Sequence, residues 1–456
     1  MRAANNDADS NSASLTQELS RAPLPPLLPP QPHLTPRRPP SSAACCSDPC
    51  WLRVVSKPIS ISSAVVLLFF LSIGVLDSIH FQPDSRSLLD NILAPIGDVY
   101  EKTYSAPLAL HLFTSEVELQ GGKIQISHPR LDYVQSTLRN DTQKQKLIET
   151  ILVKAFETSL FIVLAFFGVI VLIRSVYARR LSFTLSKTTI AGLLTLMACL
   201  LFICASYWLS RELHVLGTGK IGQDIFYATI KSIRTGLLIG ILTTLFMMPL
   251  ALLLGIAAGY FGGVIDDVIQ YIYTTLSSIP GVLLISAAVL SMQTYITNHP
   301  EQFSTLEENA DARLLALCFI LGVTSWTSLC RLLRAEAMKL KEVDYVLAAK
   351  ALGSGSFKII LKHLLPNVMH IVIITFVLDF SFLVLAEAVL SYVGVGVSPL
   401  TLSWGNMINA ARLELARDPL VWWPMIAAFA FMFTLVLASN LFADAVEDAF
   451  NPRHHP

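Results

Sequence analysis

Hydrophobic residues gather into long runs with few charges, separated by polar segments that contain most of the charged residues. A helix needs about 20 apolar residues to cross the hydrocarbon core of a bilayer. Eight runs reach or approach this length, and each is predicted to form a membrane-spanning helix: Pro58–Leu76, Thr158–Ile173, Thr188–Ser210, Thr235 to about Gly259, Val268 to about Met292, Leu314–Cys330 with its flanks, Asn367 to about Tyr392, and Pro419–Ala443. The second run is short, but Glu157 and Arg174 can extend it by reaching the interfaces. The predicted fold is an all-α, polytopic membrane helix bundle.

Composition supports this prediction. Hydrophobic residues make up 53% of the chain and charged residues only 14%, whereas soluble domains average about 25% charged. The formal net charge is zero, which does not indicate a nucleic-acid partner. Residues 1–57 differ from the rest because they are rich in proline and serine and lack an apolar period, so we expect a disordered tail.

Basic residues predict the orientation, because those in short loops stay on the cytoplasmic side. They cluster before the first run, between the second and third, and between the sixth and seventh. The clusters comprise Arg53, Lys57, Arg174, Arg179, Arg180, Lys187, Arg331, Arg334, Lys339, Lys341, Lys350, Lys358 and Lys362. All three fall on one side of the predicted bundle. Both termini are therefore predicted to be cytoplasmic, and residues 77–157 to be an extracytoplasmic segment long enough for a small domain.

Two nucleotide-binding patterns were considered. Gly217, Gly219 and Gly222 satisfy G-x-G-x-x-G literally, but they follow a membrane span on the predicted external side rather than a strand of a βαβ unit. The sequence contains no G-x-x-x-x-G-K-[ST] pattern, so ATP-driven work would need another subunit. Histidine, cysteine and carboxylate residues show no catalytic or metal-binding spacing. We therefore expect neither an enzyme nor a cofactor or metal site.

The polar segment at 340–366, between the sixth and seventh runs, is too polar to enter lipid. Ala348 and Ala349 are good helix formers, and Gly353 is a helix stop. A second short helix then leads to Leu365 and Pro366. This pattern predicts a helix, turn and helix on the membrane surface. The small alanines would let another protein approach the backbone, and Gly353 would permit the bend.

Asp344–Gly353 together with His363–Asn367 resembles the EAA loop of ABC importer permeases, in particular the dipeptide, oligopeptide and nickel permease family. In that family the loop forms a coupling helix that sits in a cleft of the ATP-binding subunit. The resemblance implies an ATPase-coupling role for Asp344, Tyr345, Ala348, Ala349, Gly353, Leu365 and Pro366. Leu347 stands where the family signature has a glutamate, so a polar anchor of the loop is replaced by an apolar residue.

Further motifs extend the resemblance from His214 to Arg453. They are His214–Thr218 with Gly222 and Asp224, Gly259–Gly263 with Asp266, Ile279–Gly281, Glu387–Gly396, Ser403–Met407 and Asn451–Arg453. Gly219 and Gln223 depart from the family, which has an acidic and a basic residue there. The resemblance implies a six-helix permease core at 211–453, to which the helix pair at 158–210 is added. Because two helices are added, every later helix crosses the membrane in the same direction as it does in the six-helix core.

Asp379, Glu387 and Pro280, which lie inside the runs, are candidates for a translocation path or gate. Asp379 lies near the middle of the seventh run, where a charge costs about 2.5–3.5 kcal/mol, and Glu387 lies eight residues further on a neighbouring face. Pro280 interrupts the fifth run, and Pro249 interrupts the fourth. A structural interpretation is open for each of them. Asp379 could be protonated or bonded to nearby hydroxyls at Thr375 or Ser381, Glu387 could support the external interface, and the prolines could be packing features.

The resemblance implies a permease subunit of an ATP-driven ABC importer for peptides in a bacterial inner membrane. Its expected partners are a second permease in a heterodimer, two ATP-binding subunits, an extracytoplasmic binding protein and membrane lipid. One alternative is a proton-coupled secondary transporter that uses Asp379 and Glu387, although the sequence has no inverted repeat. The other is a structural or assembly membrane protein.

Overall fold

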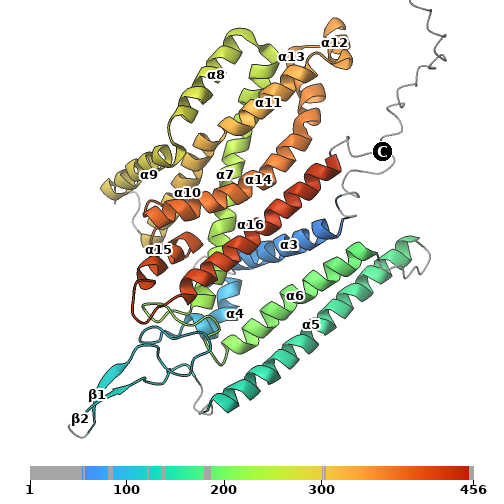
Figure 1. Ribbon diagram of the computed structural model, residues 1–456. Coiled ribbons are helices and arrows are strands. Elements are labelled where there is room, and N and C mark those ends of the chain that lie inside the picture. The colour runs from blue at the N-terminus through green and yellow to red at the C-terminus, as the bar shows by residue number, and fades with distance from the viewer. Residues whose placement is uncertain are drawn as a thin grey trace, which may run out of the picture. The chain divides into compact units, whose positions relative to one another are not determined.

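The computed structural model describes residues 54, 57–80, 86–120, 123–134, 140–178, 186–299, 301 and 305–450 (Figure 1). Within these residues, eight helices are long and apolar enough to cross a membrane, which confirms the predicted helix bundle. They are α3 (Pro58–Ser78), α5 (Asp141–Ala178), α6 (Lys187–Ser210), α7 (Ile225–Phe261), α9 (Gly281–Asn298), α10 (Leu306–Ser325) continued by α11 (Thr327–Leu340), α14 (Leu365–Val393) and α16 (Trp423–Phe450). The predicted tail, apart from residues 54 and 57, and the motif Asn451–Arg453 lie outside the described residues.

The prediction of one continuous helix from Val268 to Met292 is wrong. This stretch belongs to two helices, α8 (Gly263–Ser278) and α9, separated at Ile279 and Pro280. Ile279 is extended, with φ −89° and ψ 132°, because a residue before proline is disfavoured in the helical region. Only α9 of these two is long and apolar enough to span a membrane. In contrast, α7 continues through Pro249.

Other spans also differ from prediction at their ends. α7 begins at Ile225, ten residues before the predicted start. α10 begins at Leu306, eight residues before the predicted start. Thr305 and Glu308 form a capping box there: the Glu308 amide donates to Thr305 Oγ1 at 3.1 Å and the Thr305 amide donates to the Glu308 carboxylate at 3.2 Å. α16 begins at Trp423 rather than Pro419, with Pro424 in its first turn, where a missing N–H costs no hydrogen bond.

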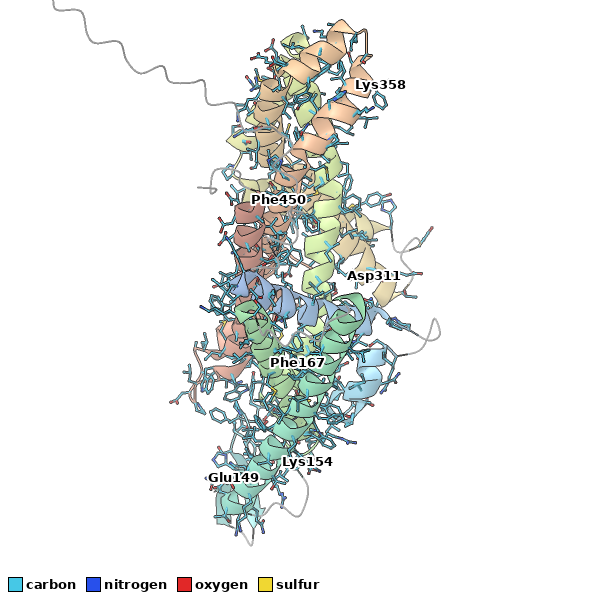
Figure 2. All side chains as sticks on the ribbon, turned by 90° about the vertical axis from the view of Figure 1, so that its right-hand side faces the viewer. Glu149, Lys154, Phe167, Asp311, Lys358 and Phe450 are labelled. Carbon is cyan, nitrogen blue, oxygen red and sulfur yellow. The ribbon has the colours of Figure 1, made fainter. Side chains whose placement is uncertain are left out.

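The segment after α3 has structure that the sequence pattern did not reveal. It contains α4 (Leu88–Gly97) and an antiparallel hairpin of β1 (Glu116–Gln120) and β2 (Lys123–Ser127). This hairpin is a small correction to the all-α prediction. α5 begins at Asp141, so the last part of the predicted 77–157 segment is helical and continuous with the second span. Figure 2 shows Glu149, Lys154 and Phe167 following one another along this helix.

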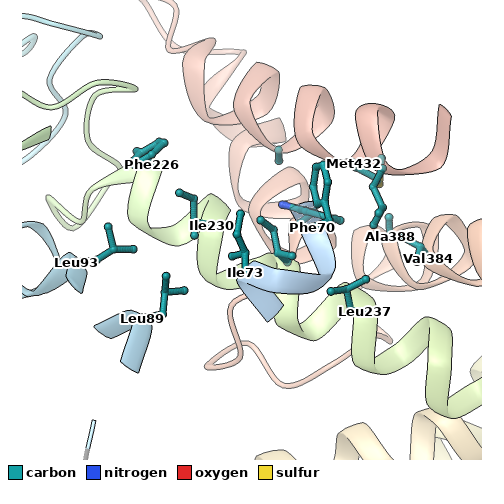
Figure 3. Close-up of a cluster of buried hydrophobic side chains, with 14 of the residues drawn as sticks. Phe70, Ile73, Leu89, Leu93, Phe226, Ile230, Leu237, Val384, Ala388 and Met432 are labelled. Atoms are coloured by element: carbon teal, nitrogen blue, oxygen red, sulfur yellow. The ribbon is translucent and has the colours of Figure 1, made fainter. Parts of the chain in front are cut away.

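A large buried cluster joins α3, α4, α7, α14 and α16 with the short helix α15 (Trp404–Glu414). Figure 3 shows Phe70 and Ile73 of α3 among side chains of the neighbouring helices. Phe70 meets Trp404 edge to face, with ring centroids 6.4 Å apart. α3 also packs along α16, and Lys57 Nζ lies 2.6 Å from Asp448 Oδ2. The first and last spans are therefore neighbours.

The added helix pair packs at the side of α3. α6 lies against α3, and α5 lies against α6. α3 and α6 approach closely at Gly192, where a Cβ atom would come within 2.5 Å of Ile61 Cγ2. A larger residue at this crossing would require the Ile61 side chain or the helices to shift.

Candidate functional site

The segment predicted to be a helix, turn and helix has that form. α12 (Asp344–Ala351) is followed by a turn, the short helix α13 (Ser356–Ile359), a π-helical turn η2 (Ile360–Leu364) and then α14, with Leu365 and Pro366 in its first turn. Gly353 has φ +78°, and no atom lies within 4 Å of the place a Cβ would take. Its N–H donates to the Lys350 carbonyl at 3.0 Å. The backbone conformation, not crowding, requires glycine here.

One face of α12 is fixed to the bundle. Val346 is buried in a cluster with Leu333 of α11 and Ile359 of α13. Asn367 Nδ2 donates to the Tyr345 hydroxyl at 3.0 Å and to the His363 carbonyl at 2.6 Å. Tyr345 is thus tied to the start of α14. Movement of α12 would therefore be passed to α14 through both apolar packing and this amide.

Several large apolar side chains of this segment are exposed, among exposed charged residues. Leu347 is 49% exposed, Leu352 87% and Phe357 76%. Ala348 is exposed beside them, while Ala349 is half-buried. Large apolar side chains are thus exposed in a segment that is otherwise polar. We call Leu347, Leu352 and Phe357 the α12 patch.

A second link leads from α8 to the helix before α12. Arg334 of α11 donates two hydrogen bonds to Asp266 of α8, at 2.5 Å and 2.6 Å, a bidentate pair that fixes both position and orientation. Next to it, α7 crosses α11 at Gly259, where a Cβ would lie 2.6 Å from the Arg334 carbonyl oxygen. Sequence analysis noted Asp266 but missed its partner, for which the only signal was the basic cluster.

The break between α8 and α9 borders a cavity of about 580 Å³, and Asp379 of α14 lines it. Ile279 and Gly281, on either side of Pro280, line the same cavity. Asp379 is the only ionisable residue among the described residues that line it. Of the three candidates for a translocation path, Asp379 and the break at Pro280 border this cavity. Glu387 is not among the residues that line it.

Glu387 lies at the junction of α14 and α15, where it is 3% exposed. Ser391 Oγ donates to its Oε1 at 2.6 Å. Ser381, which sequence analysis considered as a partner of Asp379, lies instead 2.7 Å from Asn440 Oδ1 and 2.8 Å from the Leu378 carbonyl. The surroundings of Glu387 match a packing role more closely than those of Asp379 do.

A buried charge cluster lies in the loop between α6 and α7. His214 Nδ1 is 2.6 Å from Asp224 Oδ2, and His214 Nε2 is 3.6 Å from Glu101 Oε1, an ion-pair distance. Asp224 also caps α7 by accepting a hydrogen bond from the Tyr227 amide at 3.0 Å. Burial lowers the pKa of His214, but the two carboxylates outweigh it and raise the pKa to about 9.

Glu101 was missed by sequence analysis, because it lies in an irregular segment with no periodic signal. Burial raises the pKa of its carboxyl, but His214 and the amides of Asp132 and Tyr133 outweigh burial and hold the pKa below its usual value. Gly222 has φ +76°, and a Cβ there would lie 1.7 Å from the Glu101 carbonyl oxygen. The segment around Glu101 therefore encloses the loop that contains His214.

The eight helices that are long and apolar enough to cross a membrane define a multi-pass membrane protein, and the side chains of the α12 patch are exposed on it. Residues 251–454 match the family described as binding-protein-dependent transport system inner membrane component. The chain is 30% identical over 243 residues to the dipeptide transport system permease protein DppC of Lactococcus lactis subsp. cremoris, covering 53% of this chain and 65% of the relative. It is also 30% identical over 241 residues to the glutathione transport system permease protein GsiD of Pectobacterium atrosepticum, covering 53% and 73%.

The oligopeptide transport system permease protein OppC of Mycobacterium tuberculosis is 28% identical over 239 residues, covering 52% of this chain and 76% of the relative. This chain belongs to the family of binding-protein-dependent transport system inner membrane components, which are membrane permeases. The match spans just under two thirds of the length of the Lactococcus relative.

Proposed function

We propose that this chain is a non-catalytic permease subunit of an ATP-driven ABC importer for peptides. It receives substrate from an extracytoplasmic binding protein, pairs with a second permease in a heterodimer, and delivers the substrate to the cytoplasm of a bacterial cell. The names of the relatives support the substrate class, because they include dipeptide, oligopeptide and glutathione transport. The whole chain is then a multi-pass protein of the inner membrane, with α12 in the cytoplasm.

The observation that carries this proposal is the α12 patch. Its apolar side chains face away from the bundle, while Val346 and Tyr345 fix the same helix to α11 and α14. A helix held on one face and uncovered on the other can transmit the movement of a bound partner. Closure of two ATP-binding subunits would act on α12, and the Tyr345–Asn367 contact would pass the movement to α14.

The cavity beside Asp379 is the proposed part of the translocation path in this subunit. α14 lines it, and α14 is also the helix that α12 would move. Ile279 and Gly281, on either side of Pro280, also line it. Movement of α14 against this break would change access to the cavity, which is how a gate between two sides of a membrane works.

Reconstitution into liposomes tests the proposal. The chain, a second permease, two ATP-binding subunits and a binding protein should accumulate a labelled oligopeptide only when ATP is supplied on the α12 side. Omitting any one component should abolish accumulation. Uptake by this chain alone, driven by a proton gradient, would overturn the proposal and favour a secondary transporter.

A further inference from the structure

A groove with almost entirely apolar walls lies between α3 and the added helix pair. Its volume is about 470 Å³. The wall residues include Val65, Leu68, Phe69, Phe166, Leu193 and Leu196. All three contributing helices are apolar enough to span a membrane, so the groove lies within the hydrocarbon region and not in water.

The length of the groove corresponds to one leaflet. Its wall on α3 runs from Ile61 to Ser72, and its wall on α6 runs from Thr189 to Leu200. At 1.5 Å per residue each wall is about 16 Å long, and half of a hydrocarbon core of roughly 30 Å is about 15 Å. The groove therefore extends from one membrane interface to about the bilayer midplane.

The shape and lining of the groove match a lipid chain. Its walls are almost entirely apolar and about as long as one leaflet. A single extended hydrocarbon chain of one leaflet can therefore lie along it.

The shallow end of the groove is positively charged. α6 begins at Lys187, only two residues before Thr189, and Lys187 is exposed with no ion pair to any residue that the structure describes. Ser186 caps this helix, whose N-terminus favours a negative group. Residues 174–187 contain four basic residues and no acidic one. On α3, Lys57 lies four residues before the groove but is paired with Asp448.

We propose that this groove binds one acyl chain of an anionic phospholipid, with the phosphate beside Lys187 at the start of α6. The bound chain fills the seam between the permease core and the added helix pair. It therefore contributes apolar contact that the protein does not supply itself. This inference does not depend on which substrate is transported.

Native mass spectrometry of the purified full-length chain tests the site. Phosphatidylglycerol and phosphatidylcholine with the same acyl chains are added in equal amounts. We expect one tightly retained phosphatidylglycerol, at least fivefold preferred over phosphatidylcholine. Leu196→Trp should fill the groove and abolish retention, whereas Leu194→Trp, on the 68% exposed face of the same helix, should not. Lys187→Gln should remove the preference for phosphatidylglycerol, while Lys358→Gln should preserve it.

Three results would overturn the inference: equal retention of the two lipids by the unchanged protein, full retention by Leu196→Trp, or loss of the lipid whenever the second permease is bound. The last result would identify the groove as a subunit contact. If Leu196→Trp does not fold, Val65→Phe fills the groove from α3, and Leu71→Phe, whose side chain is 42% exposed, is its control.

Discussion

Gly353 shows how a single backbone conformation can matter without any contact. Its φ of +78° lies in the left-handed region, and Gly355, two residues on, has an ordinary φ of −64°. Neither glycine has an atom within 4 Å of its missing Cβ. The two positions therefore differ in backbone strain and not in space.

Gly353→Ala should weaken transport, and Gly355→Ala should not. The left-handed conformation costs an alanine about 1 kcal/mol or more, which shifts the position of α12 away from its docking geometry. We expect about a fivefold decrease in ATP-dependent uptake for Gly353→Ala, measured in the reconstituted importer. Equal uptake by the two variants would show that the turn tolerates rearrangement.

Asp379→Asn should reduce uptake about tenfold or more while the complex still assembles. The change keeps the shape of the side chain but removes the only ionisable group among the described residues that line the cavity. Uptake and co-purification of the ATP-binding subunits are measured together, and Asp379→Glu serves as the charge-preserving control. Normal uptake by the asparagine variant would leave Asp379 with a packing role.

At the scale of elements, the α12 patch makes a specific prediction about Leu347. Because the side chain is 49% exposed beside Leu352 and Phe357, we expect an apolar contact with the ATP-binding subunit. Leu347→Glu should weaken co-purification of that subunit about tenfold, since a charge would enter an apolar contact, while Leu347→Met should preserve it. Stronger binding of the glutamate variant would mean that the partner retains a site for the family's acidic residue.

Elements with a strong local signal could be predicted from the sequence. Seven of the eight apolar runs each predicted one span, and Gly353 predicted the turn after α12. α8 was not separated from α9, because the apolar residues continue through Ile279 and only the conformation before Pro280 marks the break. The β1–β2 hairpin was missed because its strands are short and mixed in polarity.

The residues of the candidate site also differ in how far the sequence could predict them. The α12 residues are close in sequence, so one motif contains them. The approach of Asp379 to the α8–α9 break and of Glu101 to His214 joins residues far apart in the chain, and no local pattern records such pairs.

At the scale of the whole molecule, the ion pair between Glu101 and His214 holds the segment around Glu101 against the loop before α7. His214 has its pKa raised to about 9, above the ordinary 6.5. Its contribution to stability, about 3 kcal/mol, is therefore complete below pH 6.5 and is lost as pH rises through 9. Glu101 has a lowered pKa, so its contribution is present above its usual 4.5 and is lost as pH falls below that value.

Thermal unfolding in detergent between pH 4 and pH 10 should therefore show a maximum near pH 5 to 6.5 and a decline toward pH 10. His214→Gln leaves two buried carboxylates without their cation, which costs about 3–5 kcal/mol, and it should flatten the alkaline decline. Lys220→Gln, a change in the same loop at an exposed side chain, is the control. An unchanged alkaline decline in His214→Gln would assign that decline to other groups.

The contact between α3 and α16 has a consequence for how the protein is made. α3 is the first described span to leave the ribosome and α16 the last, yet they pack together and Lys57 meets Asp448. The ion pair itself is half-exposed and contributes little. α3 must therefore stay in the bilayer as an independently inserted helix until nearly the whole chain has been synthesised. Only then can α16 pack against α3.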